Sequence, residues 1–118
     1  MDYSEYIDIP SVKSRFMGNE ALFKRFLFQF PDKGMLQDLE EKVSAGDAKE
    51  AFASAHTMKG VVANLSLTAV EKSISPVVEA LRAGNLPDDA DYQKLKELYE
   101  KTMEVILEIQ KADVQLFA

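Results

Sequence analysis

Residues 55–60 read Ala-His-Thr-Met-Lys-Gly and contain His56, the only histidine among 118 residues. A histidine side chain can act as a nucleophile, as an acid or base, or as a metal ligand. On a helix, Lys59 and Gly60 at i+3 and i+4 are surface neighbours of His56, and Ala63 continues the same row. We interpret the row as a histidine that takes on negative charge beside a cation, with a glycine that leaves room for a close approach.

Other kinds of site fit the sequence poorly. One histidine and no cysteine do not make a usual zinc site, and the pairs Glu40-Glu41 and Asp88-Asp89 are interpreted as surface charge. The chain contains neither a glycine-rich phosphate loop nor a nucleophile elbow. We therefore expect no metal, no cofactor and no nucleotide site, and hence no kinase activity of its own.

Composition predicts one globular domain over residues 1–118, because 47% of the residues are hydrophobic. The net charge of -6 and the pI near 4.8 argue against nucleic acid as a partner. The absence of cysteine excludes disulfides. The apolar runs are too short to span a bilayer, and the first residues do not resemble a signal peptide. We expect a cytoplasmic protein that does not bind membranes.

A helix must position His56, and the pattern around it predicts one. Asp47 and Glu50 have the spacing of a capping box, which marks a helix start after Gly46. The apolar positions that follow recur at helical spacing: Ala51, Ala55, Met58 and Val62. At 100° per residue, His56 lies about 130° from the centre of that apolar face. It should therefore be exposed.

The first part of the chain predicts a short helix from Pro10 to about Gly18 and a second helix capped by Asn19. The apolar stripe of the second helix comprises Leu22, Phe23, Phe26, Leu27 and Phe30, with Phe28 off the stripe. Pro31 and Gly34 interrupt the pattern. Residues 20–45 therefore form either one helix kinked near Pro31 or two helices end to end.

After the histidine helix, Thr68 and Glu71 predict a second capped helix that stops at Gly84-Asn85. Pro76 should face solvent and kink this helix. Its inward row is Val70, Ile74, Val77 and Leu81. A long helix follows over residues 91–112, with Leu95, Leu98, Thr102, Val105, Ile109 and Ala112 on its inner face. The tail 114–117 either packs against the helices or frays.

These helices are joined by short connections, and no segment alternates with the period of a strand. Short connections place consecutive helices side by side and antiparallel. We therefore predict an all-α fold, an antiparallel up-down four-helix bundle with one or two additional short N-terminal helices.

The segment 55–60, continued by Val61-Val62-Ala63-Asn64-Leu65, resembles the central motif of histidine phosphotransfer (HPt) domains of multistep phosphorelays. The resemblance spreads over about residues 17–85 and includes residues 78–84 on the following helix. It implies that His56 is the phosphoacceptor and that Lys59 stabilises the charge of the phosphoryl group. It also implies a binding face with Phe52, Gly60, Ala63 and Arg82, in which Val78 or Arg82 occupies the position that approaches the histidine from the next helix.

The same resemblance implies response-regulator receiver domains as partners, in two-component signal transduction. A receiver would supply Mg²⁺, a lysine and the acyl phosphate on its aspartate. A hybrid sensor histidine kinase is a further candidate partner, and we expect this chain to be a monomer. The alternative hypothesis is a non-catalytic helical adaptor for protein–protein contacts, in which His56 is an incidental surface residue.

Overall fold

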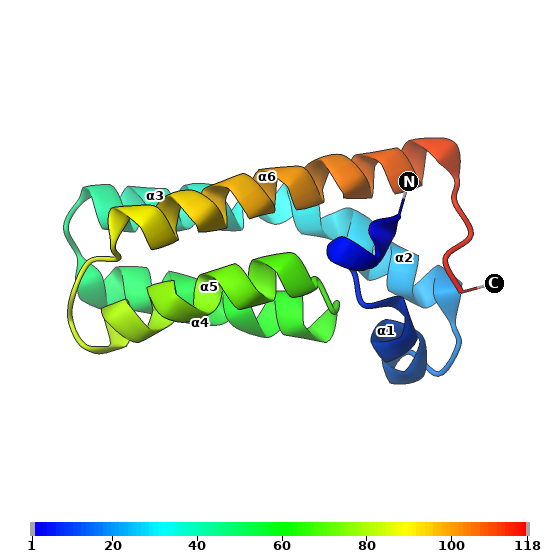
Figure 1. The fold of residues 1–118 in the computed structure, drawn as a ribbon, viewed down its shortest axis with the longest axis horizontal. Coiled ribbons are helices and arrows are strands. Elements are labelled where there is room, and N and C mark those ends of the chain that lie inside the picture. Colours follow the sequence, from blue (N-terminus) through cyan, green and yellow to red (C-terminus); the bar gives the residue numbers. More distant parts are fainter. Residues whose placement is uncertain (1, 118) are drawn as a thin grey trace.

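The computed structural model describes residues 2–117, and these residues form only helices, turns and loops (Figure 1). The order along the chain is η1 (Tyr3–Glu5), α1 (Ile9–Arg15), α2 (Glu20–Gln29), η2 (Phe30–Lys33), α3 (Met35–Ser44), α4 (Ala48–Asn64), α5 (Thr68–Arg82) and α6 (Asp89–Ala112), where η denotes a 3-10 helix.

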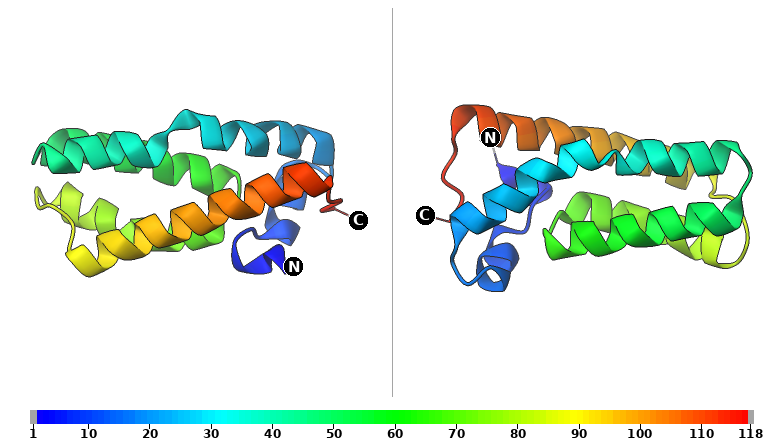
Figure 2. Two further views of the ribbon diagram at one scale, coloured as in Figure 1. Left: turned by 90° about the horizontal axis from the view of Figure 1, so that it is seen from above. Right: turned by 180° about the vertical axis from the view of Figure 1, so that it is seen from behind.

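Helices α3, α4, α5 and α6 lie side by side and alternate in direction, and α2 continues the line of α3 beyond the ends of α4 and α5 (Figures 1 and 2). The long α6 runs beside both α2 and α3. The short α1 and η1 lie at the end of the molecule where α2 extends past α4 and α5 (Figure 1). The predicted all-α antiparallel bundle with additional N-terminal helices is confirmed.

The break between α2 and α3 contains Pro31 and Gly34. Pro31 lies in the 3-10 helix η2, and Gly34 has a left-handed backbone with φ of 61°. A left-handed residue ends a helix, and glycine adopts this conformation without a steric penalty. Residues 20–45 are thus two helices end to end, which decides between the two alternatives that the sequence left open.

Helix α2 is less covered than the sequence predicts. Phe23, Leu27 and Phe30 are fully buried as expected, but Leu22 is 37% exposed and Phe26 is 45% exposed. The reason is that α2 extends past α4 and α5, so fewer neighbours surround it and only a narrow stripe is covered. Leu22 and Phe26 thus belong to the predicted apolar stripe but lie outside the buried core.

The observed starts of the helices agree with some of the starts predicted from the sequence and differ from others. Asn19 caps α2 as predicted, since its side-chain oxygen accepts a hydrogen bond from the Leu22 N–H at 3.0 Å. The predicted Thr68 cap is wrong, because the N-cap of α5 is Leu67 and Thr68 is the first helical residue. Helix α6 begins two residues earlier than predicted, after Asp88, whose carboxylate accepts a hydrogen bond from Ala90.

The buried residues of α5 and α6 show which face of each helix points into the core. The predicted row on α5, Val70, Ile74, Val77 and Leu81, is buried, and Pro76 is exposed within the helix. On α6 the structure adds Tyr99 and Ile106 to the core, while Leu98 is only partly buried and Ala112 is exposed. The Tyr99 ring packs against Phe30 with centroids 5.6 Å apart.

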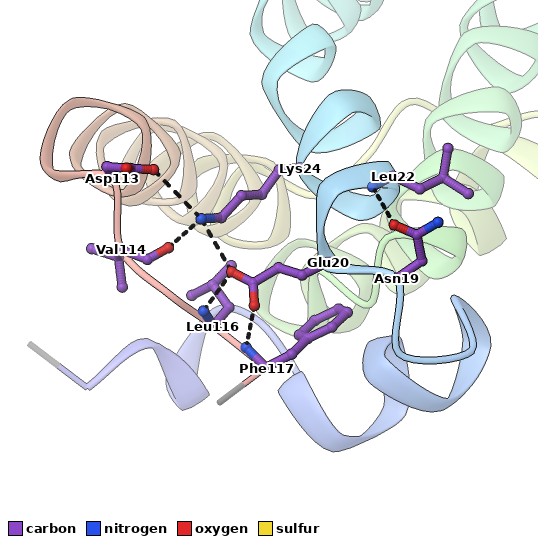
Figure 3. A network of polar contacts seen from close by, with 8 residues as sticks. All are labelled: Asn19, Glu20, Leu22, Lys24, Asp113, Val114, Leu116 and Phe117. Carbon is purple, nitrogen blue, oxygen red and sulfur yellow. Dashed lines mark hydrogen bonds and ion pairs between the residues drawn. The ribbon is translucent and has the colours of Figure 1, made fainter.

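The C-terminal tail packs against α2 (Figure 3). The Glu20 carboxylate accepts hydrogen bonds from the main-chain N–H groups of Leu116 and Phe117, both at 2.8 Å. Lys24 lies 3.1 Å from Glu20 and donates to the Val114 carbonyl. The Phe117 ring stacks on Phe23 with centroids 5.6 Å apart. Of the two alternatives for the tail, packing is the one observed.

Candidate functional site

Helix α4 presents His56 to solvent, as its sequence predicts. The helix begins after Asp47, whose carboxylate accepts a hydrogen bond from the Glu50 N–H at 3.0 Å. Its inward residues, Ala51, Ala55, Met58 and Val62, are all fully buried. Because those residues fix the rotation of α4, His56 points away from the core and is exposed.

Around His56 the surface of α4 is open. Gly60, one turn further on, is exposed, and a β-carbon added there would meet no heavy atom within 4 Å. Lys59 and Ala63 are partly exposed on the same side of the helix. The structure therefore places the four residues of the predicted row on one side of α4, and at Gly60 the surface is open to an approaching group.

Phe52 lies between Arg82 and His56 and contacts both. The ring centroids of Phe52 and His56 are 5.5 Å apart, with the planes inclined by 37°. The Arg82 guanidinium carbon lies 5.1 Å from the Phe52 centroid, so α5 contributes a cation to this face of α4. Arg82 also pairs with Glu79 through its Nε at 3.5 Å. Val78 is fully buried, so of the two α5 candidates only Arg82 reaches the surface.

On the other side of the histidine row, α4 is joined to α3 by a polar contact. The Ser54 hydroxyl donates a hydrogen bond to Asp38, and Lys42 lies 2.7 Å from the same carboxylate. The hydrogen bond from Lys42, together with that from Ser54, holds the pKa of Asp38 below its usual value. Asp38 and Ser54 are 16 positions apart, so helix periodicity alone could not have identified the contact.

Two open grooves border α4 on the α2 and α3 side, and the sequence did not predict them. One, of about 430 Å³, includes Lys33, Asp38, Ser54 and Thr57 in its lining. The other, of about 420 Å³, is lined by Arg15, Phe16, Phe26, Lys33, Val61, Asn64 and Leu65. Lys33 borders both grooves and adds a cation to this flank of α4. Lys33 lies at the end of η2, and the course of the chain there brings it to α4. No local sequence pattern near His56 predicts this position.

Residues 2–117 bring together no group of three or more His, Cys, Asp or Glu side chains that could hold a metal ion. Within the same range, every helix is too short or too polar to cross a membrane. The exposed imidazole of His56 lies next to the Phe52 ring, which Arg82 contacts from α5.

Comparison with known proteins supplies the family. The model of the Hpt domain family matches residues 22–110, a range that contains His56, the whole of α3, α4 and α5, and α6 except its last two residues. Searches of curated proteins and of solved structures gave no significant match. Because the family model covers most of the chain, the protein belongs to the Hpt domain family, whose members transfer phosphoryl groups in two-component signalling.

Proposed function

We propose that this protein is a phosphorelay intermediate that accepts a phosphoryl group on His56 and donates it again. The exchange partners are the aspartates of response-regulator receiver domains. The observation that carries the proposal is the exposure of the single histidine on α4, beside the open position at Gly60, in a chain of the Hpt family. The chain acts as a covalent carrier and depends on its partners for phosphate.

The reaction is a reversible transfer between two side chains. The Nε2 lone pair of a neutral imidazole attacks the phosphorus of the aspartyl phosphate, with the imidazole proton on Nδ1. The N–P bond forms as the P–O bond to the aspartate breaks, and the aspartate leaves as a carboxylate. The reverse step returns the group to a second receiver. The receiver supplies the Mg²⁺ that neutralises the phosphoryl oxygens.

The neighbours of His56 have distinct roles in this scheme. Lys59 pairs with the phosphoryl oxygens and stabilises their charge in the transfer. Gly60 and Ala63 leave space for the receiver surface, so that its aspartate reaches an in-line position. Phe52 and Arg82 form the α5 side of the same binding face.

Phosphotransfer from a panel of purified receivers tests the proposal. Each receiver is phosphorylated with labelled phosphate and mixed with this protein, and the label on the protein is followed with time. We expect at least one receiver to give an adduct that is labile in acid and stable in alkali, as a phosphohistidine is. His56→Gln should fold normally and take up no label, whereas Glu104→Gln on α6 should behave as the wild type.

The adaptor hypothesis predicts a different result. A non-catalytic adaptor would bind a partner without taking label, and its binding would not change in His56→Gln. Label that persists in His56→Gln would also refute the proposal, because the chain holds no second histidine.

A further inference from the structure

We propose that Phe52 is a positioning residue, which holds the imidazole of His56 in the orientation that exposes Nε2 to the receiver. This inference rests on the proposed function, and it adds a cause for the reactivity of one particular nitrogen. The observation behind it is the row of contacts in which Arg82 lies over the Phe52 ring and Phe52 in turn packs at a tilt against His56, which joins α5 to the exposed face of α4.

An exposed histidine has two free torsions, and a half-turn about the second exchanges Nδ1 with Cδ2 and Nε2 with Cε1, so the place of Nε2 depends on this torsion. Side chains on a helix lean toward its N-terminus, so the side chain of His56 lies over the turn that contains Phe52 at i−4. The two rings are 5.5 Å apart and inclined by 37°, a separation typical of interacting aromatic pairs. This contact favours ring orientations that pack on Phe52 and leave the outer edge of the imidazole in solvent.

Phe52 can position a neighbour only if it is itself held. It is partly buried and packs against the hydrophobic core. The Arg82 guanidinium lies 5.1 Å from its ring centroid, at a distance typical of a cation–π contact. Glu79 pairs with Arg82 on α5 and so favours the arginine conformation that reaches across to α4. The support for the imidazole therefore comes from a second helix as well as from α4.

The consequence for catalysis is geometric. In-line transfer requires the attacking nitrogen to lie opposite the leaving aspartate oxygen, and small misplacements of reacting atoms cost large factors in rate. An imidazole that spends less time in the correct orientation reacts more slowly once the receiver is bound. Binding of the receiver depends on the whole face, so it should change little. Phe52 should thus affect the rate constant of transfer at saturation more than the apparent KM for the receiver.

Three variants test the inference. Phe52→Leu keeps an apolar side chain but removes the aromatic face, and Phe52→Tyr keeps the ring. Phe28→Leu makes the same exchange at another partly buried phenylalanine, on α2. Each is compared with the wild type by thermal unfolding, by proton NMR of the His56 ring and by transfer from a labelled receiver at several concentrations. Phosphoramidate, which phosphorylates imidazole with release of ammonia, gives a rate that needs no receiver.

In Phe52→Leu we expect a changed ring-current shift on the His56 ring protons and a fall of about tenfold in transfer at saturation, with KM within twofold. Phe52→Tyr should restore both the shift and the rate, and Phe28→Leu should leave both unchanged. Equal rates in Phe52→Leu and wild type, or a KM that rises while the saturating rate holds, would overturn the inference. Failure of the wild type to accept label from any receiver would instead refute the proposed function.

Discussion

Glu20 and Phe117 stand 97 positions apart, yet the Glu20 carboxylate accepts a hydrogen bond from the Phe117 main-chain N–H at 2.8 Å. The neighbouring N–H of Leu116 binds the other carboxylate oxygen at the same distance (Figure 3). A single side chain at the start of α2 thus holds the end of the chain, and Lys24 strengthens the site through its ion pair with Glu20. This contact predicts a pH dependence of stability.

Glu20→Gln should destabilise the protein at pH 7 by about 1–2 kcal/mol, because a charged acceptor of two N–H groups is lost. Burial of Glu20 acts to raise its pKa, but the two N–H donors and Lys24 outweigh burial, and the net pKa is lowered. The folded pKa thus lies below the unfolded one. The stabilisation is fully present above the unfolded pKa and is lost as the pH falls through the folded pKa. Urea unfolding of both proteins from pH 7 down to pH 3 measures this.

The two unfolding free energies should converge as the pH falls. A constant gap at every pH would show that Glu20 stabilises the tail without its charge. Asp32→Asn, at an exposed position in η2, is the matched control and should show a much smaller gap at pH 7.

Lys59→Ala should fold as the wild type does, because a partly exposed lysine contributes little to stability. It should slow phosphotransfer by about tenfold or more, since the cation nearest the developing charge is removed. Lys94→Ala removes an exposed lysine from α6 and should leave transfer unchanged. The measurement is the single-turnover rate of phosphotransfer for the wild type and the two variants. Equal rates in all three proteins would show that Lys59 is an ordinary surface residue with no part in the transfer.

Gly60→Gln separates docking from chemical reactivity. The position is helical and nothing lies within 4 Å of an added β-carbon, so the variant should melt at or above the wild-type temperature. The long side chain would occupy the space of the approaching receiver, and we expect about a hundredfold loss of transfer. Reaction with phosphoramidate should change little. Gly60→Ala is the control and should transfer nearly normally. Normal transfer in Gly60→Gln would place the receiver on another side of α4.

Asp113→Gly should stabilise the protein. Asp113 ends α6 in the left-handed conformation, with φ of 50°, which costs roughly 1 kcal/mol for a residue with a β-carbon. It also places a negative charge at the C-terminus of a helix. Its ion pair with Lys24 is long, at 3.9 Å, and fully solvated on the aspartate side, so little is lost with it. A rise in Tm of roughly 4 °C is expected by calorimetry, and no change or a fall would contradict this account.

Local patterns predicted the geometry of the part of the candidate site that lies on one helix. The exposure of His56 follows from the period of Ala51, Ala55, Met58 and Val62, because four buried residues fix the rotation of α4. The spacing that places Lys59, Gly60 and Ala63 beside His56 is equally local. The family resemblance added Arg82, and the structure supplies its contact with Phe52.

What the sequence could not predict depends on contacts between helices. The bond between Ser54 and Asp38 requires the relative placement of α3 and α4. The exposure of Leu22 and Phe26 depends on where α4 and α5 end beside α2, which a stripe on α2 cannot reveal. The wrong prediction of Thr68 as the N-cap of α5 has a different cause, because the first residue of a helix is often uncertain by one position.

The attachment of the tail to α2 has a consequence for folding kinetics. Its two ends are 97 positions apart, so forming it early would require closing a loop of nearly the whole chain. The pairs α3–α4, α4–α5 and α5–α6 are neighbours in sequence and can form first. The tail should therefore dock after the transition state. Changes such as Glu20→Gln should then appear as faster unfolding with an almost unchanged folding rate, which makes this contact a determinant of how long each molecule stays folded.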